Sequence, residues 1–160
     1  MKKLLLLRHA KSSWEYSVQD YDRPLSEKGI NDINKVSLKN ISFFEKFQLV
    51  MTSPANRAFH TSTIFTRNVF IKFEKLRVVN ELYTFDYKNV VDYIYKLDST
   101  FSSIALIGHN PAFSDAAEYL SDKKTPELKT SDWIMLEFKQ KDWSNINNGT
   151  FTYESKKDRK

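Results

Sequence analysis

Short apolar runs and segments of helical apolar spacing alternate along the chain, with polar loops between them. The first predicted strand, Lys3–Leu7, holds four consecutive leucines, which favours burial on both faces of a sheet. After a polar loop, apolar positions recur at helical spacing behind Ser26, whose hydroxyl can cap a helix. The other predicted strands are Gln48–Thr52, Leu76–Val79, Ser103–Ile107, Trp133–Phe138 and Gly149–Tyr153.

Helical segments lie between these runs. Ser53-Pro54 predicts a helix start with serine as N-cap and proline at the first helical position, and Asn110-Pro111 repeats the signal. Alternating strands and helices predict an α/β three-layer sandwich, in which helices flank a mostly parallel central sheet. The last two strands are expected to form a hairpin or an edge pair.

Chain length and charge narrow the organisation. The 160 residues predict a single domain over residues 1–155, followed by a basic and disordered tail at 156–160. Much of the formal net charge of +5 belongs to this tail, so we interpret it as a solvated end and expect no nucleic-acid binding. We expect a monomer.

The composition also excludes several kinds of site and location. The chain contains no cysteine, which excludes disulfides, a thiolate nucleophile and Cys-ligated metals. No apolar run approaches the roughly 20 residues that span a bilayer, so no membrane association is expected. The lysines and leucines at the start resemble a short signal peptide, but Arg8 ends the apolar run too early. The cytoplasm is therefore the expected compartment.

Arginine or histidine follows three of the predicted strands. Arg8 and His9 end the first, Arg57 comes shortly after the second, and His109 follows the fourth. Ligands of open α/β sheets bind at the carboxyl ends of the strands. Guanidinium groups bind phosphate in a planar, bidentate way and repel a metal cation, so we expect no metal site. A neutral imidazole beside bound phosphate is a good nucleophile toward phosphorus, and fixed cations stabilise the transition state.

The motifs around these residues resemble those of a known family. Arg8-His9-Ala10 is similar to the RHG/RHA signature of the histidine phosphatase superfamily, which has the phosphoglycerate-mutase-like fold. The stretches 8–14 and 22–29 resemble the SixA-type phosphohistidine phosphatase branch. Ser53-Pro54-x-x-Arg57-Ala58-x-x-Thr61 and Gly108-His109-Asn110-Pro111 are similar to its second and third motifs.

The resemblance implies a role for each motif residue. His9 is the nucleophile that becomes phosphorylated, Arg8 and Arg57 clamp the phosphate, and His109 hydrogen-bonds the transferring group. Water then hydrolyses the phosphoenzyme, and no metal or organic cofactor takes part.

The proton donor is less clearly marked. Many members carry a carboxylate after the third strand, and Glu81 is the nearest candidate here, ahead of Asp86. An alkoxide leaves poorly without a proton, whereas a phosphorylated imidazole can be protonated beforehand near neutral pH. A site without a strong general acid would therefore suit phosphohistidine better than phosphoserine.

Three functions remain open. The leading one is dephosphorylation of phosphohistidine on a protein, and the alternative is a phosphatase for small phosphorylated metabolites, with Glu81 as the acid. The third is a non-catalytic phosphate-binding module, which would need no nucleophile such as His9. A mutase is disfavoured, because the short chain has little extra sequence to enclose a diphosphorylated intermediate. His60 is interpreted as a surface residue of the second helix.

Overall fold

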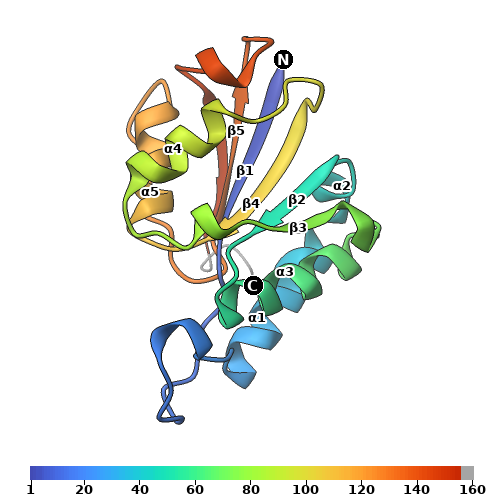
Figure 1. Ribbon diagram of the computed structural model, residues 1–160. Coiled ribbons are helices and arrows are strands. Elements are labelled where there is room, and N and C mark those ends of the chain that lie inside the picture. The colour runs from blue at the N-terminus through green and yellow to red at the C-terminus, as the bar shows by residue number, and fades with distance from the viewer. Residues whose placement is uncertain (156–160) are drawn as a thin grey trace.

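The computed structural model describes residues 1–155 and contains one six-stranded sheet, in the order β3-β2-β4-β1-β5-β6 (Figure 1). The strands are β1 (Lys2–Arg8), β2 (Leu49–Thr52), β3 (Leu76–Val78), β4 (Ser103–Gly108), β5 (Trp133–Phe138) and β6 (Thr150–Glu154). The helices are α1 (Glu27–Lys39), α2 (Ile41–Phe44), α3 (Asn56–Asn68), α4 (Tyr87–Tyr95) and α5 (Ala112–Leu120). The predicted basic tail lies outside the described residues.

The sheet is mostly parallel, as the alternating pattern predicted. Strands β1, β2, β3 and β4 pair in parallel, while β5 runs antiparallel to β1 and β6 antiparallel to β5. The last two strands therefore form the predicted edge pair. None of the helices within residues 1–155 is both long and apolar enough to cross a membrane.

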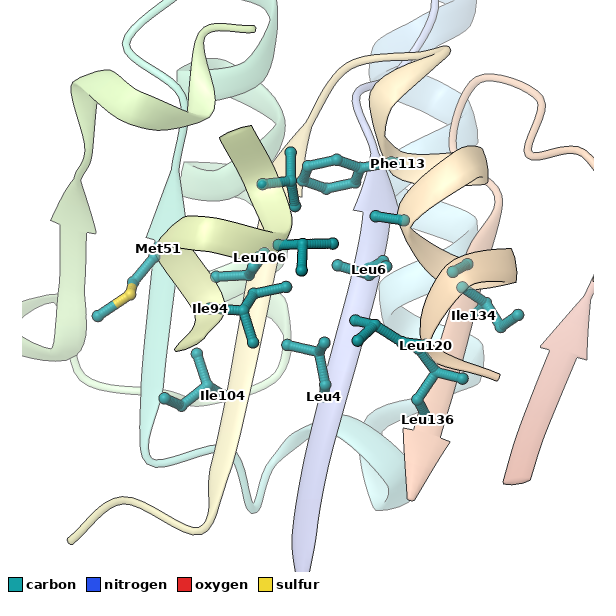
Figure 2. Close-up of a cluster of buried hydrophobic side chains, with 14 of the residues drawn as sticks. Leu4, Leu6, Met51, Ile94, Ile104, Leu106, Phe113, Leu120, Ile134 and Leu136 are labelled. Carbon is teal, nitrogen blue, oxygen red and sulfur yellow. The ribbon is translucent and has the colours of Figure 1, made fainter. Parts of the chain in front are cut away.

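The leucines of β1 explain the three layers. Leu4 and Leu6 pack with α4 and α5 on one face of the sheet (Figure 2), whereas Leu5 and Leu7 pack with α1, α2 and α3 on the other. All four leucines are fully buried, since successive side chains of a strand point to opposite faces. Each such leucine stabilises the fold by about 1.5–3 kcal/mol relative to an exposed one, so the continuous run is expected of a strand covered on both sides.

Strand register brings the ends of β1, β2 and β4 together. Strand β4 lies between β2 and β1, and Arg8 pairs with Gly108 while Thr52 pairs with Ile107. The residues that directly follow these strands are His9, His109 and Ser53. They consequently lie side by side at the carboxyl ends of the strands. The parallel core thus positions residues that lie far apart in the sequence.

The two predicted helix starts are shifted. Helix α3 begins at Asn56 with Ala55 as N-cap and has no side-chain cap, so the prediction that Ser53 caps it is wrong. The hydroxyl of Ser53 is engaged elsewhere, as described below. Helix α5 begins at Ala112, one residue after Pro111, although the Asn110 side chain still accepts a hydrogen bond from the backbone N–H of Ser114 in the first turn.

Candidate active site

A cavity of about 540 Å³ opens at the carboxyl ends of β1 and β4 and contains the four residues that the motifs singled out. Its lining residues are Arg8, His9, Lys11, Ser12, Trp14, Asp20, Arg23, Lys28, Arg57, Phe85, His109, Asn110, Lys129 and Thr130. Cations outnumber the single carboxylate in this lining, and such a balance favours an anionic ligand.

His9 is held in one tautomer. Its side chain is nearly buried, with 6% exposed, and Nδ1 lies 2.7 Å from the carbonyl oxygen of Ala10. A carbonyl oxygen can only accept, so Nδ1 carries the proton and Nε2 keeps its lone pair. In the free protein Nε2 accepts a hydrogen bond from the Nε–H of Arg57, at 3.3 Å. His9 therefore presents an unprotonated nitrogen to the guanidinium of Arg57.

Helix α3 carries Arg57 and also anchors the backbone just after His9. Thr61 follows Arg57 by one helical turn, so the two side chains lie on the same face of the helix. The Thr61 hydroxyl accepts from the backbone N–H of Ala10 at 3.0 Å and donates to the Arg57 carbonyl at 2.6 Å. One buried threonine thus fixes the backbone beside His9 relative to the helix that carries Arg57.

The guanidinium of Arg57 lies between the two histidines. It is 1% exposed, and its Nη2 lies 3.3 Å from Nδ1 of His109. Because a guanidinium only donates, Nδ1 of His109 accepts, and its Nε2 must carry the proton. That Nε2–H donates to the Ser53 hydroxyl at 2.7 Å, which explains why Ser53 is not free to cap α3. The two imidazole rings are 5.2 Å apart between centroids.

Arg8 is directed by a segment far along the chain. Its Nη1 donates to the carbonyl oxygen of Leu128 at 2.9 Å. Within residues 1–155 its buried Nε–H has no hydrogen-bond partner. An unpaired buried donor is costly, and a phosphoryl oxygen in the cavity would satisfy it. Arg8 therefore fits the phosphate-binding role that the motif implies.

The loop after β1 adds residues that the sequence analysis missed. Asp20 accepts from Arg57 at 3.0 Å, from Arg23 at 2.9 Å and from the Tyr83 hydroxyl at 2.6 Å. Arg23 also donates to the Ser12 hydroxyl and stacks on the ring of Trp14, 3.9 Å from its centroid. These contacts close one side of the cavity with charged and aromatic groups.

Glu81 is not brought to the cavity. It belongs to the short 3-10 turn Asn80–Leu82 and lines a neighbouring groove, where burial and then the charge of Glu81 raise the pKa of Tyr93. Asp86 caps α4 by accepting from the backbone N–H of Lys88. His60 is partly exposed on α3 and does not line the cavity either. A general-acid role for Glu81 stays a prediction.

Both pocket histidines are neutral in the free protein. Burial, followed by the nearby arginines, lowers the pKa of His109 to about 3, and burial together with His109 and Arg57 holds the pKa of His9 well below its usual value. An unfolded histidine titrates near pH 6.5, so below that pH the unfolded chain binds more protons than the folded one. Folding stability is therefore present above about pH 6.5 and is lost as the pH falls toward the folded pKa values.

We expect His109 to lower the free energy of unfolding by about 2 kcal/mol between pH 7 and pH 5, and His9 to lower it further in the same direction. Urea denaturation at the two pH values measures this loss, and in a His109→Asn variant the loss should be about 2 kcal/mol smaller. Asp20 does not contribute in this range, because its three donors keep the pKa of its carboxyl far below pH 5. Equal stability at pH 7 and pH 5 would show that the histidines are not held neutral.

A comparison with protein-family models identifies the family of this chain. Residues 4–93 match the sequence model of the histidine phosphatase superfamily, branch 1. An uncharacterized chloroplast protein of Arabidopsis thaliana is 31% identical over 153 residues, covering 89% of this chain and 69% of that protein.

Solved structures share the fold. The protein histidine phosphatase SixA in complex with tungstate superposes with a TM-score of 0.79 at 22% identity, over 94% of each chain. Mycobacterial glucosyl-3-phosphoglycerate phosphatase superposes with a TM-score of 0.67 at 13% identity, over 96% of this chain and 97% of that one. One fold thus accommodates phosphatases whose names point to different substrate classes.

Proposed function

The chain belongs to the histidine phosphatase superfamily and is a phosphatase, and from this premise we propose that it removes phosphate from phosphohistidine on a protein, through a phosphoenzyme formed at His9. The observation that carries the proposal is the acid–base content of the cavity. Of the carboxylates in residues 1–155, Asp20 alone lines it, and Asp20 is held ionised by Arg57, Arg23 and Tyr83.

The geometry supports transfer to Nε2 of His9. The lone pair on Nε2 forms the new nitrogen–phosphorus bond as the substrate's phosphorus–nitrogen bond breaks, and the released electron pair goes to the leaving imidazole. Arg8 and Arg57 provide N–H donors for the equatorial phosphoryl oxygens, which carry the charge in the transition state. Water then attacks the phosphorus, inorganic phosphate leaves, and Nε2 regains its lone pair.

His109 can respond to the bound anion. In the free protein its Nδ1 accepts from Arg57, and the positive surroundings disfavour a second proton on the ring. A phosphoryl dianion in the cavity offsets those charges and favours the imidazolium, which could then donate from Nδ1. Substrate binding would accordingly be accompanied by uptake of a proton at His109.

The leaving group decides between substrate classes. A positioned general acid contributes about 10²–10⁴-fold to a rate, and an ionised Asp20 cannot supply its proton to an alkoxide. A phosphorylated imidazole needs less help, since its second nitrogen can be protonated beforehand near neutral pH. A cavity of cations whose one lining carboxylate is held ionised therefore favours phosphoramidate over phosphate esters.

We expect a peptide carrying phosphohistidine to be hydrolysed at least about 10²-fold faster than the same peptide carrying phosphoserine, because only the ester depends on an external acid. Release of inorganic phosphate measures both rates. Glu81→Gln should change neither rate by more than about twofold, since Glu81 lines a different groove. Rapid ester hydrolysis that collapses in the Glu81→Gln variant would instead establish a small-molecule phosphomonoesterase.

A further inference from the structure

One carboxylate holds the outer edge of the central arginine. Asp20 lies in the 3-10 turn Asp20–Asp22 and contacts Arg57 twice, through its backbone carbonyl at Nη1 and through Oδ2 at Nη2, 3.0 Å away. The remaining contacts of Arg57 go to Nε2 of His9 and Nδ1 of His109, both at 3.3 Å. The contacts of this buried guanidinium are thus divided between Asp20 and the two histidines.

The division follows the shape of the guanidinium. Its end edge, Nη1 and Nη2, faces Asp20, while its side edge, Nε and Nη2, faces the histidines. A planar guanidinium offers its donors in a fixed fork, so holding one edge determines the direction of the other. With Asp20 in place, the side edge stays directed at Nε2 of His9 and Nδ1 of His109, next to which a phosphoryl group must lie to be attacked by His9.

Asp20 is itself held from two further directions. Arg23 donates to Oδ1 at 2.9 Å, and the hydroxyl of Tyr83 donates to Oδ2 at 2.6 Å. The Tyr83 ring packs edge-on against Tyr21 and His109, with centroids 5.3 Å and 5.4 Å away. The carboxylate therefore has little freedom, although 45% of its side chain is exposed.

We propose that Asp20 is a positioning residue that fixes Arg57 with its side edge toward the phosphoryl group. The inference rests on the proposed function, because it assumes that His9 attacks a phosphoryl group bound beside Arg57. It assigns Asp20, in the loop after β1, a part in catalysis that acts through Arg57. The opposite role for Asp20 would be an internal anion that competes with the phosphate for Arg57, and the two roles predict opposite changes in activity.

Asp20→Ala is the decisive variant, and Asp22→Ala is its matched control. The two residues lie in the same turn and carry the same charge, but the Asp22 side chain does not line the cavity. We expect kcat for a phosphohistidine peptide to fall about 10- to 100-fold in Asp20→Ala, as a misdirected guanidinium would cause, and to stay unchanged in Asp22→Ala. KM should not rise, because removing a negative charge cannot weaken phosphate binding electrostatically.

The split between kcat and KM separates the roles. A lower kcat with an unchanged or lower KM supports positioning, whereas partial unfolding would reduce the active fraction and also lower the melting temperature. A higher kcat/KM in Asp20→Ala would show that Asp20 competes with substrate, and an unchanged kcat would show that Arg57 needs no such support. Either of these two results overturns the inference.

A second measurement stays informative even if phosphohistidine is not the substrate. In ¹⁵N-labelled protein the Nε–H of Arg57, a buried donor to His9, should give a resolved signal that is protected from exchange with water. We expect Asp20→Ala to broaden or shift this signal and to speed its exchange, and Asp22→Ala to leave it in place. A signal that is the same in both variants would refute positioning, whatever the activity assays show.

Discussion

Replacing His9 with alanine is expected to lower turnover of a phosphohistidine peptide by about 10⁴-fold or more, because the attacking atom itself is removed. The same variant should take up no radiolabelled phosphate, while the wild-type protein should form an acid-labile phosphohistidine. Rapid quenching followed by gel autoradiography measures the label. Nε2 of His9 is the unprotonated nitrogen of a ring whose Nδ1–H is fixed by Ala10, and no other histidine shares that arrangement with Arg57 within residues 1–155.

His60→Ala is the matched control for this prediction. His60 is also a histidine near Arg57 in the chain, but it lies outside the cavity lining, so its variant should keep full labelling and turnover. Tungstate should still bind to His9→Ala, because Arg8 and Arg57 remain, and calorimetry measures this binding. Equal labelling of His9→Ala and wild type would place the nucleophile elsewhere and refute the mechanism.

Arg57→Lys is expected to lower kcat/KM by about 10³-fold, although it preserves the charge. A lysine ammonium is a point charge with rotating donors. It cannot contact His9, His109 and Asp20 together from one planar group, as the guanidinium does. The loss should fall mainly on kcat, since a positive charge near the phosphate still supports binding. Steady-state kinetics on the phosphohistidine peptide provide the measurement.

Arg67→Lys tests whether the effect is specific to the pocket. Arg67 lies on the same helix, α3, but is exposed near its C-terminal end, so the substitution should leave both kcat and KM within about twofold. A kcat/KM for Arg57→Lys within tenfold of the wild-type value would mean that charge alone suffices. The fork geometry of Arg57 would then have no catalytic importance.

The arrangement of strands was predictable because its signals are local. Four consecutive leucines indicate a strand covered on both faces, and the structure buries all of them between two helical layers. Parallel pairing then brings the ends of β1 and β4 together, so His9 and His109 could be expected at one edge before any coordinates existed. Parallel pairing of β1 with β4 thus accounts for the positions of both histidines.

Other parts of the site depend on competition that no local pattern reveals. Ser53 has the sequence signature of a helix cap, but its hydroxyl accepts from His109, which follows another strand, β4, and α3 begins later. Asp20 lies in a loop without periodicity, and its role depends on Arg57 and Tyr83, which are distant in sequence. The cluster of arginines predicts that a carboxylate pairs with them. The number of acidic residues in the sequence, however, does not identify Asp20 as that carboxylate.

The carbonyl oxygen of Leu128 has a practical consequence for anyone who would transplant this chemistry. It accepts from both Arg8 and the Asn110 side chain, which belong to the first and third motifs. The backbone N–H of Leu128 is bonded to the Ser114 hydroxyl on α5, so the position of this carbonyl is itself determined. A scaffold grafted with the motif residues alone would lack this shared anchor, and a working graft would also need to import the segment that carries Leu128.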